Sequence, residues 1–163
     1  MDANPFAFLP AVFYLLEEQC DMMRSPKTFY LIDDDSDDLD FFCEAVDTID
    51  NSIICIKATD SERALDSFRT HDIPVPDLIF LDLNMPVIDG RTFLKQIKMI
   101  KAYAGVPVIV YSTSSDPRDR KETVALGAAK FMTKPYTMKK LVEDLSGVLQ
   151  TYCKHSSFSS INQ

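Results

Sequence analysis

The feature that most constrains the fold is a repeated alternation of short apolar runs with stretches of helical periodicity. Five apolar runs suit strands, and each is followed by a segment whose apolar residues recur every three or four positions. The predicted strands are 28–33, 52–58, 77–82, 107–112 and 130–133. Five β-α units in succession predict an α/β fold with one parallel sheet, helices on both faces and right-handed crossovers.

Caps and apolar spacing predict where the helices begin. The first helix is expected over 36–49 with Ser36 as its cap, and the second opens with Thr59 and Glu62 in a capping-box arrangement. The other three are predicted to begin at Asp89, Asp116 and Thr137. Gly127 is the expected stop for the helix that starts after Asp116.

The charge of the chain is concentrated in one short segment. The 163 residues carry 25 acidic and 17 basic side chains, a net charge of −8. Residues 1–40 hold ten acids and two bases, which is the whole imbalance, and six of those acids lie between Asp33 and Asp40. A net negative charge repels nucleic acid phosphates, so we expect no nucleic acid partner.

The pattern predicts one domain over 28–150, an N-terminal extension over 1–27 and a tail over 151–163. The apolar stretch 6–16 is too short to span a bilayer and lacks the features of a signal peptide. The four cysteines form no C-x-x-C pair, which favours a reducing compartment. We therefore expect a cytoplasmic protein with no membrane partner.

Two interpretations of the extension stay open. In one, residues 1–27 form an added helix that docks on the domain or makes a homodimer contact. In the other, translation begins at Met22 or Met23, just before the domain.

Polar side chains follow the predicted strands at the edge where such folds bind ligands. They are Asp33, Asp34 and Asp35 after the first strand, Asp82 after the third, Ser112 and Thr113 after the fourth, and Lys134 after the fifth. Clustered carboxylates stay ionised together only if a cation neutralises them, and oxygen ligands favour Mg²⁺, Mn²⁺ or Ca²⁺. A carboxylate beside such a metal can attack a phosphoryl group, while a hydroxyl and a lysine hold the phosphoryl oxygens. The pattern indicates phosphoryl transfer.

Four segments, in this order, resemble the motifs of the receiver domain of two-component response regulators. They are LIDDDSDD at 31–38, IFLDLNMPVIDG at 79–90, PVIVYS at 107–112 and FMTKPY at 131–136. The resemblance covers 28–150, about three quarters of the chain. It implies the CheY-like, doubly wound (βα)5 fold, which is flavodoxin-like with strand order 2-1-3-4-5.

The resemblance also implies a role for each candidate site residue. Asp82 is the phosphoacceptor and, with Asp33, Asp34 and the backbone carbonyl of Asn84, a ligand of Mg²⁺ or, in its place, Mn²⁺. The remaining assignments are Ser112 as the conserved hydroxyl, Lys134 as the conserved lysine, Phe131 as the switch aromatic and Pro135 as the cis-proline position. Asp37, Asp38 and Asp40 are expected to stay solvated in the first turns of the helix.

The implied function is that of a single-domain response regulator. A sensor histidine kinase or phosphotransfer protein donates the phosphoryl group, and the chain catalyses only its own phosphorylation and dephosphorylation. Ser112 and Phe131 then change the face formed by the fourth helix, strand 130–133 and the last helix, which a downstream protein target contacts. Only thirteen residues follow position 150, so we expect output by protein contact.

Three alternatives remain beside this interpretation. One is a pseudo-receiver, a binding module that is never phosphorylated. Another is a haloacid dehalogenase type phosphatase, which needs a second aspartate where this chain has Asn84. The third is an EF-hand calcium loop starting at Asp33, which is disfavoured because Asp38 stands where the loop needs glycine and a strand precedes it.

Overall fold

A computed structural model describes residues 27–153, so the predicted extension, apart from Lys27, and residues 154–163 lie outside it. The described chain alternates strictly between strand and helix. Its elements are β1 (Thr28–Ile32), α2 (Ser36–Ile49), β2 (Ile54–Ala58), α3 (Ser61–Thr70), β3 (Leu78–Leu81), α4 (Gly90–Met99), β4 (Val108–Ser112), α5 (Pro117–Ala125), β5 (Lys130–Thr133) and α6 (Met138–Tyr152). Within residues 27–153, no helix has both the length and the apolar character that a bilayer crossing requires.

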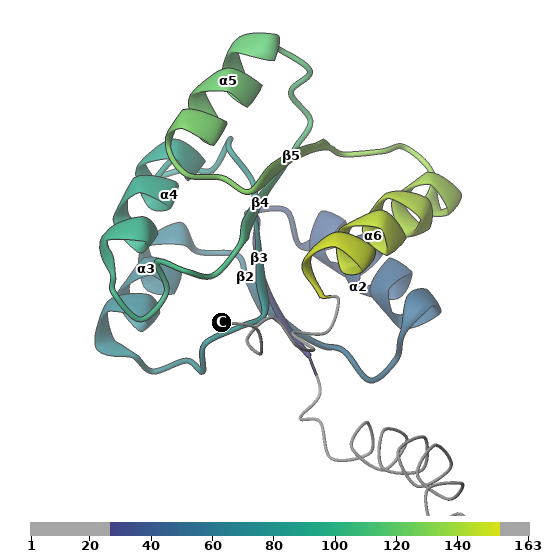
Figure 1. The fold of residues 1–163 in the computed structure, drawn as a ribbon, viewed down its shortest axis with the longest axis horizontal. Coiled ribbons are helices and arrows are strands. Elements are labelled where there is room, and N and C mark those ends of the chain that lie inside the picture. The colour runs from purple at the N-terminus through teal and green to yellow at the C-terminus, as the bar shows by residue number, and fades with distance from the viewer. Residues whose placement is uncertain (1–26, 154–163) are drawn as a thin grey trace, which may run out of the picture.

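The five strands form one parallel sheet in the order β2-β1-β3-β4-β5, which confirms the predicted strand order. Helices α3, α4 and α5 cover one face of this sheet, and α2 and α6 cover the other (Figure 1). The fold is therefore the doubly wound, flavodoxin-like one. The strand order reverses beside β1, so the carboxyl ends of β1 and β3 flank the switch point, where such folds bind ligands.

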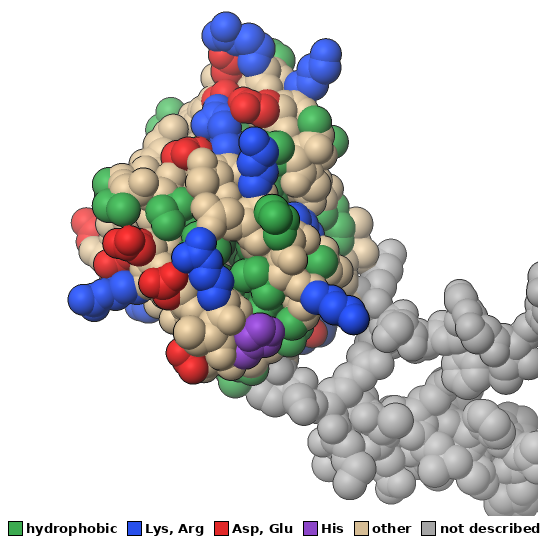
Figure 2. All heavy atoms as spheres, turned by 90° about the vertical axis from the view of Figure 1, so that its left-hand side faces the viewer, with side chains coloured by type: hydrophobic (Ala, Val, Ile, Leu, Met, Phe, Trp, Pro, Cys, Tyr) green, Lys and Arg blue, Asp and Glu red, His purple; other side chains and the backbone are tan. Residues whose placement is uncertain are grey.

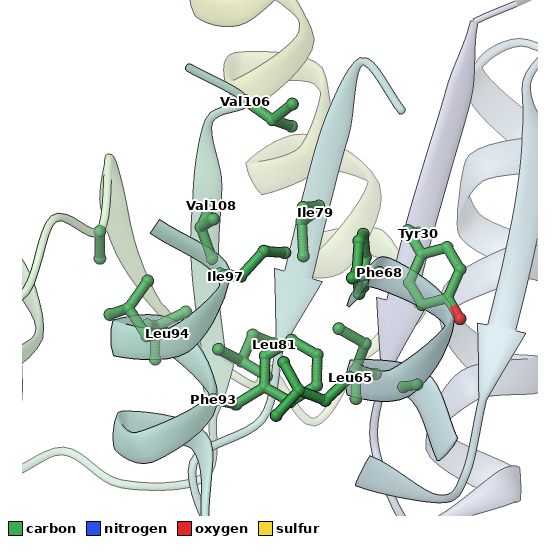
Figure 3. Close-up of a cluster of buried hydrophobic side chains, with 14 of the residues drawn as sticks. Tyr30, Leu65, Phe68, Ile79, Leu81, Phe93, Leu94, Ile97, Val106 and Val108 are labelled. Atoms are coloured by element: carbon green, nitrogen blue, oxygen red, sulfur yellow. The ribbon is translucent and has the colours of Figure 1, made fainter. Parts of the chain in front are cut away.

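Two apolar layers sandwich the central strands. Along β1, Phe29 and Leu31 face the α2/α6 layer, whereas Tyr30 and Ile32 face the layer under α3 and α4. Figure 3 shows the second layer, in which Phe68 of α3 lies against Tyr30 with ring centroids 4.9 Å apart. Because β1, β3 and β4 are buried on both faces, the residues that follow them start from rigid positions.

The helix caps correct two sequence predictions. Asp35, rather than Ser36, caps α2, and its carboxylate accepts from two backbone N–H groups of the first turn. Asp60 caps α3 in the same way, so the predicted pairing of Thr59 with Glu62 is wrong. In each helix the capping aspartate is the sequence neighbour of the predicted hydroxyl residue. Its carboxylate accepts from two backbone N–H groups, so it is a better cap than the hydroxyl. The predicted starts of the other three helices are confirmed, because Asp89, Asp116 and Thr137 are the N-caps of α4, α5 and α6.

Candidate functional site

Four strands bring polar side chains to one edge of the sheet. Asp33 follows β1, Asp82 follows β3, Ser112 ends β4 and Lys134 follows β5. Backbone pairing continues one residue past the strands, because Asp82 N–H donates to Ile32 O at 2.9 Å and Lys134 N–H donates to Ser112 O at 2.8 Å. The side chains of the site therefore start from the sheet itself rather than from free loops.

Asp33, Asp34 and Asp82 form a carboxylate cluster. One oxygen from each lies within 4.8 Å of the others. Asp33 and Asp82 are buried and Asp34 is exposed, so the cluster opens to solvent on the Asp34 side. Three carboxylates this close repel one another unless a cation lies between them. An all-oxygen set of this kind fits a hard divalent ion such as Mg²⁺ or Mn²⁺.

Lys134 lies beside this cluster and is bound to it unequally. Its Nζ donates to Asp33 Oδ2 and to Asp38 Oδ2, both at 2.6 Å, but lies 3.7 Å from Asp82 Oδ1. The Lys134 side chain is only 10% exposed, and its ammonium lies 5.6 Å from the centroid of the Tyr111 ring. The ammonium therefore forms hydrogen bonds with two carboxylates and has only a longer electrostatic contact with the third.

Burial and ion pairing act in opposite directions on the titrating groups of the site. Burial raises the pKa of Asp33, and the hydrogen bonds from Lys134 and from the Asp35 N–H only partly offset this. Burial alone would lower the pKa of Lys134, but its hydrogen bonds to Asp33 and Asp38 reverse the effect and raise that pKa. Lys134 is therefore held as an ammonium, whereas burial raises the pKa of Asp33 despite its hydrogen bonds.

The loop after β3 is fixed tightly under Asp82. Asp82 Oδ2 accepts from Asn84 N–H at 2.7 Å. Gly90 packs directly on the same segment, because a Cβ at this position would lie 2.2 Å from the Asp82 carbonyl oxygen. Val87 has φ of 66°, a strained value for a β-branched residue, and its side chain is exposed. The sequence alone assigned no role to Gly90 or Val87. For Gly90, its place directly after Asp89 at a predicted helix start could have indicated a special position.

Ser112 and Phe131, the predicted switch residues, are both buried. The Ser112 hydroxyl accepts from Ser114 N–H at 3.4 Å, whereas neighbouring Thr113 is exposed. Phe131 is 4% exposed and packs in the α3/α4 layer. The guanidinium carbon of Arg120 lies 5.1 Å from the centroid of the Phe131 ring. The Phe131 ring therefore points into the core in this structure.

Two acids that were expected to be solvated form ion pairs. Asp38 binds Lys134, and Asp40 Oδ1 accepts from Lys57 Nζ at 2.6 Å. The prediction was wrong for Asp38, which is partly buried against Lys134. Asp40 pairs with Lys57 but its side chain is 70% exposed, so it stays solvated as predicted. Asp37 is exposed, as predicted.

Two further expectations are settled by the backbone. No peptide bond among residues 27–153 is cis, so the bond before Pro135 is trans and the predicted cis-proline is wrong. The EF-hand alternative fails, as expected, because the strand β1 directly precedes Asp33 and Asp35 caps a helix.

Comparisons with known proteins agree on one family. The family model described as response regulator receiver domain matches residues 29–146. Response regulator Rcp1 from Synechocystis sp. is 30% identical over 132 residues, which cover 78% of this chain and 90% of that protein. The crystal structure of the phosphorylated cyanobacterial phytochrome response regulator RcpA has a TM-score of 0.72 at 27% identity, covering 82% of this chain and 99% of that one.

Other similarities concern a metal-bound form and longer proteins. The Mn²⁺-bound form of Rcp1 has a TM-score of 0.71 at 27% identity, covering 83% of this chain and 100% of that one. A probable transcriptional regulator ycf27 from Porphyridium aerugineum is 33% identical over 106 residues, which cover 65% of this chain. The match spans only 42% of that regulator, so its similarity concerns one part of a longer protein.

Proposed function

The chain belongs to the response regulator receiver family of two-component signalling, and on that basis we propose that it accepts a phosphoryl group on Asp82. Receiver domains interact with histidine kinases or phosphotransfer proteins, which carry the group on a histidine. The observation that carries the proposal is the placement of Asp82. Its buried carboxylate lies at the switch point of the sheet, beside two further carboxylates and 3.7 Å from a lysine ammonium.

The proposed reaction is an in-line transfer to a carboxylate. The bond between an Asp82 oxygen and phosphorus forms as the P–N bond to the donor imidazole breaks, and that imidazole leaves carrying a proton. The Asn84 N–H holds Asp82 Oδ2, which restricts rotation of the nucleophile. Lys134 balances charge on the phosphoryl oxygens once it leaves its resting contacts, and the Ser112 hydroxyl is the second donor.

We propose Mg²⁺ as the metal, with Mn²⁺ as a substitute. Asp33, Asp34, Asp82 and the Asn84 carbonyl are the proposed ligands, and the Mn²⁺-bound form of Rcp1 supports this choice. Bound there, the ion would neutralise the carboxylates and the incoming phosphoryl oxygens. The residues of the chain still orient the nucleophile and keep most of the site away from bulk water.

The proposed output is a change of surface rather than a second reaction on a separate substrate. Phosphorylation draws Ser112 and Lys134 toward Asp82 and further favours the inward packing that Phe131 already has in this structure. This shifts the face made of α5, β5 and α6, where a downstream protein binds. Figure 2 shows basic and acidic side chains interleaved at the α5 end of the molecule, which suits a protein partner better than nucleic acid.

A small phosphodonor tests the acceptor role without a partner. Acetyl phosphate with Mg²⁺ should add the mass of one phosphoryl group to the wild type, and Asp82→Asn should abolish the adduct. Asp40→Asn is the matched control, since it removes one acid of α2 that binds Lys57 rather than the site. A wild type that gains no mass would instead support the non-phosphorylated pseudo-receiver. An adduct of equal yield in Asp82→Asn would overturn the assignment of Asp82.

A further inference from the structure

Asp38 has no place in the proposed metal site, yet it forms one of the two shortest contacts of Lys134. It lies in the first turn of α2, and its Oδ2 is 2.6 Å from Lys134 Nζ. We propose, on the basis of the function above, that Asp38 is a positioning residue that holds Lys134 away from Asp82 until the phosphoryl group arrives. Asp38 acts through Lys134 and does not itself touch the reacting atoms.

The first step of the argument is the geometry of the ammonium. Contacts of 2.6 Å to Asp33 and Asp38 are charge-assisted hydrogen bonds, whereas 3.7 Å to Asp82 is too long for one. The face of Tyr111 closes off part of the remaining space around Nζ. Lys134 is therefore oriented toward α2, and its movement toward a phosphoryl oxygen on Asp82 stretches the contact with Asp38.

The second step is competition with a cation. Asp33 belongs to the carboxylate cluster that fits a divalent ion, and such an ion repels the ammonium that shares its ligand. Asp38 lies outside that cluster, so it remains a partner for Lys134 when Asp33 binds the ion. The contact between Asp38 and Lys134 thus favours binding of the divalent ion before phosphoryl transfer. After transfer, the same contact opposes the hydrogen bond from Lys134 to the phosphoryl group.

These two steps predict opposite effects for removal of the Asp38 carboxylate. Without it, Lys134 depends more on Asp33 and competes better with the divalent ion, so Mg²⁺ should bind more weakly. At saturating Mg²⁺, however, Lys134 has no contact with Asp38 to stretch, so a phosphoryl analogue should bind more tightly. The Asp38 side chain is 41% exposed, so solvent screens the contact and both changes should be modest.

The test compares Asp38→Asn with Asp37→Asn, which makes the same charge change in the same helical turn. Asp37 is exposed and makes no ion pair with Lys134 in the described structure. Calorimetry would measure Mg²⁺ binding alone and beryllofluoride binding at saturating Mg²⁺. Relative to Asp37→Asn, we expect Mg²⁺ about two- to fivefold weaker and beryllofluoride about three- to tenfold tighter in Asp38→Asn. Asp38→Glu, which keeps the carboxylate, should recover part of both changes.

The outcomes separate this inference from the proposed function. If the wild type binds beryllofluoride but Asp38→Asn matches Asp37→Asn in both titrations, Asp38 does not position Lys134. Weaker beryllofluoride binding in Asp38→Asn would also overturn the inference, because it would show that the contact assists engagement. A wild type that neither binds beryllofluoride nor takes up phosphate from acetyl phosphate would overturn both proposals.

Discussion

Helices α5 and α6 flank the same strand, β5, but are held to the sheet in different ways. Helix α6 buries Leu141, Leu145 and Val148 against the layer that it shares with α2. Helix α5 buries only Thr123, whose hydroxyl bonds to the helix's own backbone. Its ties to the rest of the protein are largely polar, since Arg91 of α4 binds Asp119 at 2.5 Å and Glu122 at 2.8 Å.

The difference indicates which of the two helices should respond to the proposed phosphorylation. Apolar burial does not respond to a change of charge, so α6 should stay in place when the site is phosphorylated. Asp119 also accepts from Ser114 Oγ, and Ser114 N–H donates in turn to the buried Ser112 hydroxyl. Under the proposed function, a shift of Ser112 toward a phosphoryl group would disturb the hydrogen bonds that hold α5. Of the two helices beside β5, we therefore expect α6 to stay in place and α5 to move.

The largest expected effect comes from truncating one apolar side chain in each helix. Leu145→Ala in α6 should lower the free energy of unfolding by about 2 to 5 kcal/mol, because the side chain is 1% exposed. Val124→Ala in α5 should cost less than about 0.5 kcal/mol, because that side chain is 53% exposed. Urea denaturation of both variants measures the contrast. Equal losses would show that α5 is anchored by apolar burial as α6 is.

Removing the ion pairs between Arg91 and α5 should have a smaller and more local effect. Arg91→Ala breaks both contacts to α5, and partly exposed ion pairs of this kind contribute about 1 kcal/mol or less. We expect amide exchange to speed up about threefold to tenfold in α5 and to stay unchanged in α6. Arg63→Ala, which removes an exposed ion pair with Asp60 at the start of α3, is the control and should leave α5 unchanged. If amide exchange in Arg91→Ala sped up equally in α5 and α6, these ion pairs would not act on α5 alone.

The smallest expected effect comes from pH, because the caps of the two helices differ. Hydrogen bonds from the Arg118 side chain and N–H lower the pKa of Asp116, the cap of α5, below its ordinary 3.8. A carboxyl with a lowered folded pKa stabilises the fold above its unfolded pKa and loses that contribution as pH falls through the folded pKa. Thr137, which caps α6, does not titrate in this range.

Acidification below 3.8 should therefore increase amide exchange, after correction for its intrinsic pH dependence, more in the first turn of α5 than in that of α6. Asp116→Asn keeps a capping oxygen but removes the titration, so it should flatten the acid dependence in α5. If this variant loses protection with the same acid profile as the wild type, another group controls the start of α5.

The pattern of parallel strands predicted that the polar residues after them would share one edge of the sheet, whereas the strand order was implied by the resemblance to receiver domains. Carboxyl ends of parallel strands meet at one edge, so Asp33, Asp82 and Lys134 come together wherever the strands are placed correctly. Contacts that depend on how the helices pack on the sheet could not be predicted from the strand pattern. Asp38 meets Lys134 across 96 positions, and the close approach of Gly90 to Asp82 depends on the packing of α4. Such contacts follow from tertiary distances, which residue spacing alone does not specify.

The most direct test of the central claim is to locate the phosphoryl group chemically. Wild-type protein treated with acetyl phosphate and Mg²⁺ would be reduced with borohydride, which converts an aspartyl phosphate to homoserine, and then mapped by peptide mass spectrometry. We predict homoserine at position 82, none at Asp33 or Asp34, and none in samples prepared without the phosphodonor. Homoserine at Asp33 or Asp34 with residue 82 unchanged, or no conversion at all, would contradict the account.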